Sequence, residues 1–229
     1  MATKAKTSKS GSQGNTEKEL KEQLKDNYKQ YILLNGHEPS SIFLFMKELD
    51  LREDDFYKHY GSFHAIESSI WLDFINETVE VITSDPIYQD YSARERLLAF
   101  YYTLMERLKK DRSYVKFTVE NNIKRPEILP QFLQKFRSRF LSYVEELIHE
   151  GLDKGEIVNR PVISKRYKDG LWLQLIFVIN FWLKDDSANF ENTDAAIEKS
   201  VNLAFEFMGE GPLEKVIDFA KFLYQNRWK

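Results

Sequence analysis

Apolar residues recur at intervals of three and four along almost the whole chain, and this spacing places them on one face of an α-helix. Near the N-terminus, Leu20, Leu24, Tyr28 and Ile32 follow this spacing. No segment of useful length alternates apolar and polar residues with a period of two, as a half-buried strand does. The sequence therefore predicts an all-α protein.

Capping residues and helix breakers divide this pattern into separate helices. Thr16–Glu19 and Ser92–Glu95 have the pattern of a capping box, and Pro39 suits the first turn of a helix. Two short helices are expected on either side of the turn at residues 49–51. The longer helices are expected at residues 16–35, 62–83, 92–110, 114–122, 126–150, 162–184, 193–208 and 212–226.

The chain divides into a tail, a small head and a larger body. Residues 1–15 are rich in Lys, Ser and Gly and carry a local charge of +3, so we expect a disordered basic tail. Residues 16–61 are expected to form a three-helix head with a helix-turn-helix. Residues 62–229 are expected to form a larger helical bundle that binds a ligand and a second subunit.

The composition excludes several functional classes. The chain has no cysteine, which excludes disulfides, thiol catalysis and cysteine-based zinc sites. Because the net charge is −3, binding to nucleic acid requires a local basic surface. The N-terminus lacks the apolar core of a signal peptide, and the longest apolar stretch, residues 171–183, is too short to span a bilayer. We expect a cytoplasmic protein with no transmembrane segment.

Neither the four histidines nor the many carboxylates form a catalytic or metal-binding motif. His59 and His64 are five residues apart, which is not the spacing that places two ligands on one helix face. The acids alternate with Lys and Arg, and neither a phosphate-binding loop nor a catalytic triad is present. We expect no enzyme activity, no cofactor and no metal.

Residues 38–66 contain two short helices that meet at the turn Leu49–Leu51, which is the layout of a helix-turn-helix. The second helix of such a motif enters the major groove with its first turn. Here that turn carries the acids Glu53–Asp55. Between residues 38 and 65, three Lys or Arg stand against six acids, a local charge of −3. Since phosphate neutralisation supplies most non-specific affinity for DNA, this charge opposes binding.

The head resembles that of the TetR/AcrR family of transcriptional regulators. Gly36 stands at the family's glycine position, Ser40-Ser41-Ile42 opens the second helix, and residues 56–60 match the aromatic signature of the recognition helix. In the body, residues 148–157 resemble the Gly-x-x-x-Gly-Glu connection before the two dimer-forming helices. The resemblance implies a homodimer that binds operator DNA. It implies DNA contacts by Ser40, Arg52, Tyr57, Lys58 and His59.

The chain departs from the family where DNA contacts are expected. The family usually has Ser/Thr, Lys/Arg and Gly where this chain has Arg52–Asp55, and a phosphate-binding lysine where it has Phe63. Acids at a helix N-terminus are, however, stabilised by the helix dipole, and a carboxylate can accept a hydrogen bond from cytosine. The sequence leaves DNA binding and its loss as competing interpretations.

The apolar stretch Leu171–Leu183 forms a helix that must be covered on all sides. In the TetR arrangement one face packs on the body and the other on a partner subunit, whereas in a monomer the helix is central. Residues 197–208 add a second apolar stripe, which favours a four-helix dimer interface. The predicted interface residues are Leu175, Ile179, Trp182, Ile197, Val201, Ala204, Phe205 and Met208.

Aromatic and aliphatic residues on the central helices suggest an apolar ligand pocket, although such residues also form ordinary cores. The candidate lining residues are Phe100, Tyr101, Leu104, Phe117, Phe136, Phe140, Trp172 and Ile176. Gln174 and Asn180 are isolated amides in an apolar helix, which makes them candidates for orienting a ligand.

Two functional hypotheses follow. The first is a dimeric transcriptional regulator, such as a repressor, in which a small apolar effector changes operator affinity. The second is a protein of the same fold that has lost DNA binding and serves as a lipid- or isoprenoid-binding accessory protein. The acidic head and the aromatic body motivate the second hypothesis. The expected partners are a second copy of the chain, operator DNA and a small apolar ligand.

Overall fold

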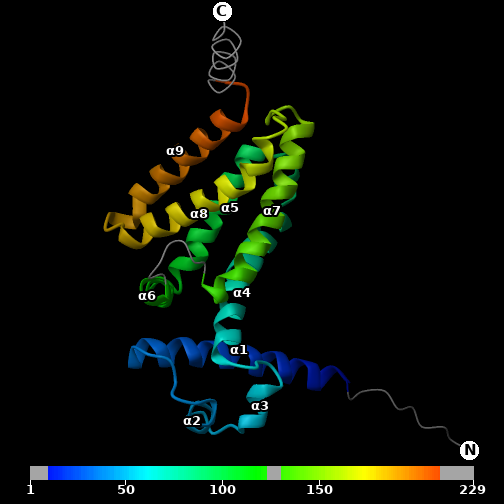
Figure 1. Ribbon diagram of the computed structural model, residues 1–229. Coiled ribbons are helices and arrows are strands. Elements are labelled where there is room, and N and C mark those ends of the chain that lie inside the picture. Colours follow the sequence, from blue (N-terminus) through cyan, green and yellow to red (C-terminus); the bar gives the residue numbers. More distant parts are fainter. Residues whose placement is uncertain (1–9, 123–129, 212–229) are drawn as a thin grey trace, which may run out of the picture. The chain divides into compact units, whose positions relative to one another are not determined.

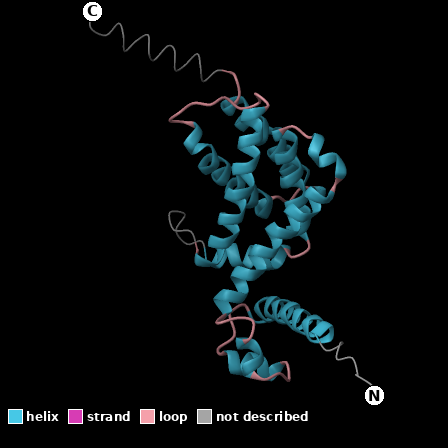
Figure 2. Cartoon of the chain, turned by 90° about the vertical axis from the view of Figure 1, so that its right-hand side faces the viewer, coloured by secondary structure: helices cyan, strands magenta, loops and turns pink. Residues whose placement is uncertain are grey.

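The computed structural model describes residues 10–122 and 130–211, and the text below concerns these residues. They contain α-helices, short 3-10 helices and loops, with no strand among them (Figure 2). This confirms the predicted all-α class. Within the described part of the chain, no helix is both long and apolar enough to cross a membrane.

The chain forms two compact units, which are described separately. The first, called the head, contains residues up to Trp71 together with residues 113–132. The second, called the body, contains residues 72–112 and those from Leu133 onward. Helix α4 (Phe63–Ser84) contributes to both units. The predicted division lay at the start of this helix, and no sequence signal assigned residues 113–132 to the head.

The head contains α1 (Ser10–Asn35), α2 (Ile42–Glu48), α3 (Glu53–Tyr57), the first turns of α4 and most of α6 (Arg112–Asn122) (Figure 1). Its core is aromatic, because Tyr28, Phe45, Phe56 and Phe63 are buried and contact one another. The Tyr28 and Phe63 rings are stacked, with centroids 5.5 Å apart. These contacts fix α2 and α3 against α1.

The turn between α2 and α3 has a left-handed residue at its centre. Asp50 has a φ of +55°, a conformation that Asp and Asn adopt more readily than most residues. The backbone N–H of Leu51 donates to the carbonyl of Met46, which satisfies a carbonyl at the end of α2. The sequence predicted this turn correctly. The left-handed backbone at Asp50 explains why an aspartate stands there, which the sequence alone did not.

The body is built from α5 (Ala93–Lys109), α7 (Gln134–Asp153), α8 (Tyr167–Lys184) and α9 (Glu191–Met208). Helix α5 packs against α7 and α9, and α8 also packs against α7 and α9. Short 3-10 helices lie at Pro86–Asp90, Gln131–Leu133, Ser164–Arg166 and Ala188–Phe190. The capping box predicted at Ser92 is present, since its hydroxyl accepts from the N–H of Glu95 and Glu95 accepts from the N–H of Ser92.

Several predicted boundaries were wrong. Helix α1 begins at Ser10, so residues 10–15, which were predicted to belong to the disordered tail, are helical. Pro39 lies before α2, whose N-cap is Ser41. Helix α7 begins at Gln134, because a 3-10 turn precedes it. The helix predicted at 212–226 lies outside the described residues.

Candidate functional site

Four of the five residues predicted to contact DNA lie on the surface of the head. Ser40, Arg52, Tyr57 and Lys58 are exposed, and the Tyr57 side chain is 53% exposed. His59 is only half-exposed, and its Nε2 atom is buried without a hydrogen-bond partner. His59 is therefore poorly placed to reach a base or a phosphate in this conformation. The structure brings the other four residues onto α3 and the residues that flank α2 and α3.

The two basic side chains of this surface are paired with acids of α3. The guanidinium of Arg52 lies 2.6 Å from Asp54 Oδ2, and the ammonium of Lys58 lies 2.7 Å from Asp55 Oδ1. The hydrogen bond from Lys58 is the main reason why the pKa of Asp55 lies below its ordinary value. Both cations are thus already neutralised inside the motif, and DNA must compete with the acids for them.

Tyr57 is held in a similar way, because its hydroxyl donates to Glu53 Oε1 over 3.4 Å. The aromatic core of the head sets the position of this surface. Phe56, the neighbour of Tyr57, is fully buried and contacts Phe45 and Phe63 edge-on. Substitution in this core would therefore move the predicted DNA-contacting residues without touching them.

A second group of polar residues in the head lies where α1, the loop before α2 and α4 meet. Glu67 is 7% exposed, and burial together with the nearby Glu38 raises its pKa to about 7. The hydroxyl of Tyr28 donates to Glu38 over 3.4 Å. His64 Nδ1 lies 3.9 Å from Glu67 Oε2. The four residues come from three separate segments of the sequence, and their spacing gave no signal of the cluster.

In the body, the residues predicted to line a ligand pocket form a packed core. Phe100 stacks on Tyr143 with ring centroids 4.8 Å apart, and Phe140 contacts both Phe100 and Trp172. Phe100, Tyr101, Leu104, Phe136 and Phe140 are fully buried, Trp172 is 8% exposed, and Ile176 is half-buried. Phe117 lies on α6 in the head, where it is half-buried. The rings fill the space that the prediction assigned to a ligand.

A small polar cavity of about 160 Å³ lies next to this core, between α4, α5 and α7. Tyr143 lies in both the aromatic core and the cavity wall, because its ring stacks on Phe100 and its hydroxyl lies 3.0 Å from that of Tyr88. Arg96 is buried beside them, stacks over the Tyr88 ring and forms an ion pair with Glu150. Burial is the main cause that raises the pKa values of both tyrosines, so both stay protonated.

The residues predicted at a dimer interface lie mostly inside one protomer. Leu175, Ile179, Trp182, Ile197, Val201, Phe205 and Met208 are all at most 9% exposed, and Ala204 is half-buried. The prediction selected the inner face of each helix, and buried side chains cannot also contact a second subunit. The outward apolar side chains are Leu173, Phe177, Leu203 and Phe207, which are 50–67% exposed. We call these four residues the outer face of α8 and α9.

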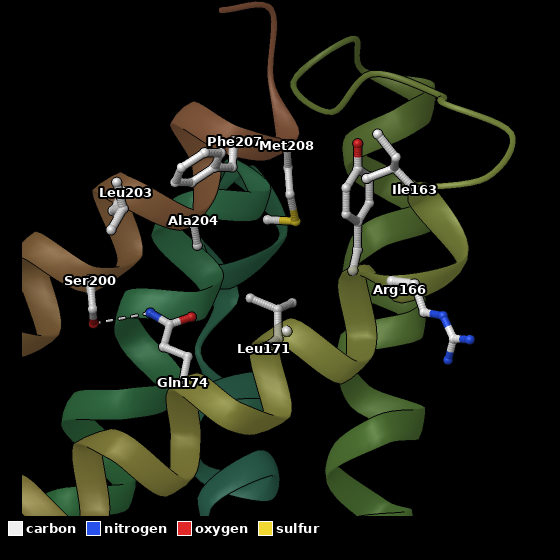
Figure 3. A pocket seen from close by; sticks show the side chains of 11 residues that line it. Ile163, Arg166, Leu171, Gln174, Ser200, Leu203, Ala204, Phe207 and Met208 are labelled. Carbon is white, nitrogen blue, oxygen red and sulfur yellow. Dashed lines mark hydrogen bonds between the residues drawn. The ribbon is translucent and has the colours of Figure 1, made fainter. Parts of the chain in front are cut away.

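An apolar groove of about 380 Å³ lies between the first half of α8 and the second half of α9 (Figure 3). It is lined by Ile163, Arg166, Tyr167, Gly170, Leu171, Gln174, Ser200, Leu203, Ala204, Phe207 and Met208. The amide of Gln174 donates to the Ser200 hydroxyl over 3.1 Å, and that of Asn180 donates to the carbonyl of Ile176. Each of the amides proposed to orient a ligand therefore makes a local hydrogen bond.

Among the described residues, no group of three or more His, Asp or Glu side chains is placed to hold a metal ion. The described chain therefore combines a small head that carries a helix-turn-helix with an all-helical body, and four of the exposed apolar side chains of the body lie on the adjacent helices α8 and α9.

Comparison with known proteins identifies the family. Residues 96–223 match the family described as tetracyclin repressor-like, C-terminal domain. Because the match spans more than half of the chain, the protein belongs to this family of transcriptional regulators, as the resemblance of its head implied. No curated protein matches the sequence.

Solved structures agree on the fold. A TetR-family transcriptional regulator from Syntrophomonas wolfei superposes with a TM-score of 0.66 at 18% identity, covering 83% of this chain and 95% of its own. A TetR family transcription regulator from Shewanella sp. PV-4 gives 0.57 at 14% identity, with 82% and 97% covered. A protein of unknown function from Rhodococcus sp. RHA1 gives 0.57 at 11% identity, with 83% and 96% covered. At these identities the likeness supports the fold alone.

Proposed function

We propose that the protein is a dimeric transcriptional regulator that binds operator DNA through α2 and α3 and responds to a small effector in the body. The observation that carries this proposal is the exposed surface around α3 in a chain of this family. Ser40, Arg52, Tyr57 and Lys58 all reach solvent there, as residues that contact DNA must.

The ion pairs of α3 shape how this surface would bind. Arg52 and Lys58 can turn from Asp54 and Asp55 to phosphates or bases, because all four side chains lie at or near the surface. An exposed ion pair is worth only about 0–1 kcal/mol, so its loss costs little. The freed carboxylates then face DNA, where the amino groups of cytosine and adenine are the major-groove base donors that they can accept from. We expect weak non-specific binding and an operator that contains cytosine or adenine at these positions.

Dimerisation is proposed through the outer face of α8 and α9. Leu173 and Phe177 on α8 and Leu203 and Phe207 on α9 give two adjacent apolar stripes. Two copies related by a two-fold axis would bury these stripes in a four-helix arrangement. The two heads of such a dimer would read two half-sites of one operator, about 34–36 Å apart.

The effector site is proposed at the cavity beside the aromatic core. Its volume of about 160 Å³ is below the range of about 300–1,000 Å³ that ligand pockets usually have. An effector must therefore displace Tyr143 or Phe100 and enter between α4 and α7. Because α4 also contributes to the head, the displacement gives a route by which binding changes operator affinity.

The test is an electrophoretic shift assay with DNA from upstream of the gene, at several salt concentrations and with unrelated competitor DNA. We expect specific binding that Arg52→Ala with Lys58→Ala abolishes, because the pair supplies the charged contacts of α3. Arg94→Ala with Lys110→Ala is the matched control, since it removes one exposed Arg and one exposed Lys from the body. Undiminished binding by the first variant would overturn the assignment of these contacts, and absence of specific binding in the unmodified protein would overturn operator binding itself.

A further inference from the structure

The body has a further hollow, of about 300 Å³, between the second half of α7 and the start of α8. This volume is at the lower end of the range of about 300–1,000 Å³ that ligand pockets usually have. From α7 it is lined by Glu145, Ile148, His149 and Leu152, which recur at helical spacing and therefore share one face of the helix. Ile148 is buried and Leu152 is half-buried, so this side of the hollow is partly apolar.

The hollow is separate from the cavity proposed for the effector. That cavity is lined from α7 by Tyr143, Glu146, Leu147 and Glu150, which show the same spacing two residues earlier. Because successive residues are turned by about 100° around an α-helix, an offset of two residues places the two sets on nearly opposite faces of α7. A ligand in one of the two sites therefore does not occupy the other.

The side chains around the hollow carry a positive charge, although the whole chain carries −3. From the start of α8 and the turn before it, the hollow is lined by Ser164, Lys165 and Lys168. Within the described lining the two lysines stand against a single acid, Glu145, which gives a net charge of +1 when His149 is neutral. A ligand with one negative charge would balance this charge.

The acids near the hollow are already paired with other cations. Lys168 Nζ lies 3.3 Å from Glu145 Oε1. Asp169 is shared by Arg166, at 3.4 Å, and Arg137, at 3.8 Å. In the part of the chain that the structure describes, no carboxylate forms an ion pair with Lys165. The ammonium group of Lys165 is therefore available to an anion from solution.

The backbone that carries Lys165 is held in place by its neighbours in the 3-10 helix Ser164–Arg166. The N–H of Arg160 donates to the Ser164 hydroxyl over 2.7 Å, and the N–H of Ser164 donates to the carbonyl of Arg160 over 2.8 Å. Arg166 is the N-cap of α8 and supplies no capping side chain. The positive end of the α8 dipole therefore adds to the attraction for an anion.

We propose that this hollow binds a small carboxylate that carries a short apolar chain. The carboxylate pairs with Lys165, and the chain covers the exposed parts of Ile148 and Leu152. An uncharged molecule would leave the ammonium group unpaired, and an anion without a chain would leave the apolar side in water. The proposal concerns a second site and does not depend on operator binding.

Calorimetric titration of the full protein, without DNA, tests the two parts of the ligand. Hexanoate has both the charge and the chain, acetate has the charge alone, and hexanamide has the chain alone. We expect hexanoate to bind at least about tenfold more tightly than either of the others, because a charged hydrogen bond and a buried chain each contribute that much. Equal binding of hexanoate and hexanamide, or of hexanoate and acetate, would overturn the proposal.

Substitution of the lysine tests the position of the carboxylate. Lys165 is exposed, so Lys165→Gln should fold normally and should bind hexanoate about tenfold more weakly. Lys165→Arg, which keeps the charge, should retain most of the affinity. Lys184→Gln is the matched control, because it removes an exposed lysine from the other end of α8. Unchanged affinity in the Lys165→Gln protein would overturn the assignment.

The lysines themselves report where the ligand lies. Reductive methylation with ¹³C-formaldehyde keeps their charge and gives each lysine an NMR signal, and single substitutions assign the signals. Hexanoate should shift the signals of Lys165 and Lys168 and leave that of Lys184 unchanged. Binding in the effector cavity instead would leave Lys165 unshifted and would be insensitive to Lys165→Gln, which would overturn the proposal without bearing on the regulator.

Discussion

The buried carboxyl group of Glu67 should make the head less stable as the pH rises. Its pKa of about 7 in the folded protein lies above the ordinary value of 4.5, because burial and the charge of Glu38 both oppose ionisation. The contribution that neutral Glu67 makes to the free energy of unfolding is fully present below pH 4.5 and is lost as the pH rises through 7. At about 1.4 kcal/mol for each pH unit between the two values, the loss amounts to about 3 kcal/mol.

Glu67→Gln should remove this dependence, because glutamine keeps the shape of the protonated acid and does not ionise. We expect the variant to match the unmodified protein at pH 4.5 and to exceed its unfolding free energy by up to about 3 kcal/mol at pH 8. Urea unfolding followed by circular dichroism at several pH values measures the unfolding free energies of the variant and of the unmodified protein. Hydrogen exchange in α1 and α4 locates the effect in the head. Glu80→Gln, an exposed change on the same helix, is the matched control.

His64 requires a second series because its Nδ1 atom lies 3.9 Å from Oε2 of Glu67. Repeating the comparison with His64→Gln separates the two groups. If the Glu67→Gln protein loses stability with rising pH as steeply as the unmodified protein, another residue is responsible and the argument is refuted.

Three further perturbations follow from the structure. Asp54→Asn with Asp55→Asn should strengthen DNA binding and steepen its salt dependence, by a slope of up to about 0.9 for each cation released to a phosphate; an unchanged slope in shift assays contradicts this. Leu173→Glu with Phe177→Glu should convert a dimer into monomers in ultracentrifugation, and a persistent dimer would place the interface elsewhere. Gly151→Ala should destabilise the body by about 1–3 kcal/mol in urea unfolding, because the added Cβ would lie 2.7 Å from Ile157 Cδ1. Gly170→Ala has open space around the new carbon and should be neutral or stabilising, so destabilisation by both would implicate helix backbone effects instead.

The existence and type of the helices could be predicted because local signals determine them. The capping box at Ser92 and the turn at Asp50 depend on residues within a few positions of each other, and the structure contains both. The grouping of α6 with the head depends on tertiary packing and leaves no trace at the ends of the helix. The cluster of Glu67, Glu38 and Tyr28 likewise joins three distant segments.

The sequence could not select the face of α8 that a partner subunit would contact, and the reason is different. Helix α8 is apolar on all sides, so its sequence cannot say which face points inward. The prediction selected Leu175 and Ile179, which are fully buried, whereas Leu173 and Phe177 are 67% and 50% exposed. A stripe of apolar residues predicts that a helix is covered, and only the packing of its neighbours decides what covers each face.

The acids of α3 bear on specificity more than on the presence or absence of DNA binding. When Lys58 exchanges Asp55 for a phosphate, the freed carboxylate recruits a counterion of its own, so the exchange releases few ions in total. If the protein binds operator DNA as proposed, its non-specific affinity, which depends on that release, should therefore be low, whereas hydrogen bonds to bases should be unaffected. The biologically relevant quantity is the ratio of specific to non-specific affinity. A helix whose cations are paired with acids would raise this ratio because it would lower the non-specific affinity. On this reasoning an acidic head is compatible with a selective regulator, provided that base contacts supply the affinity that the phosphate contacts do not.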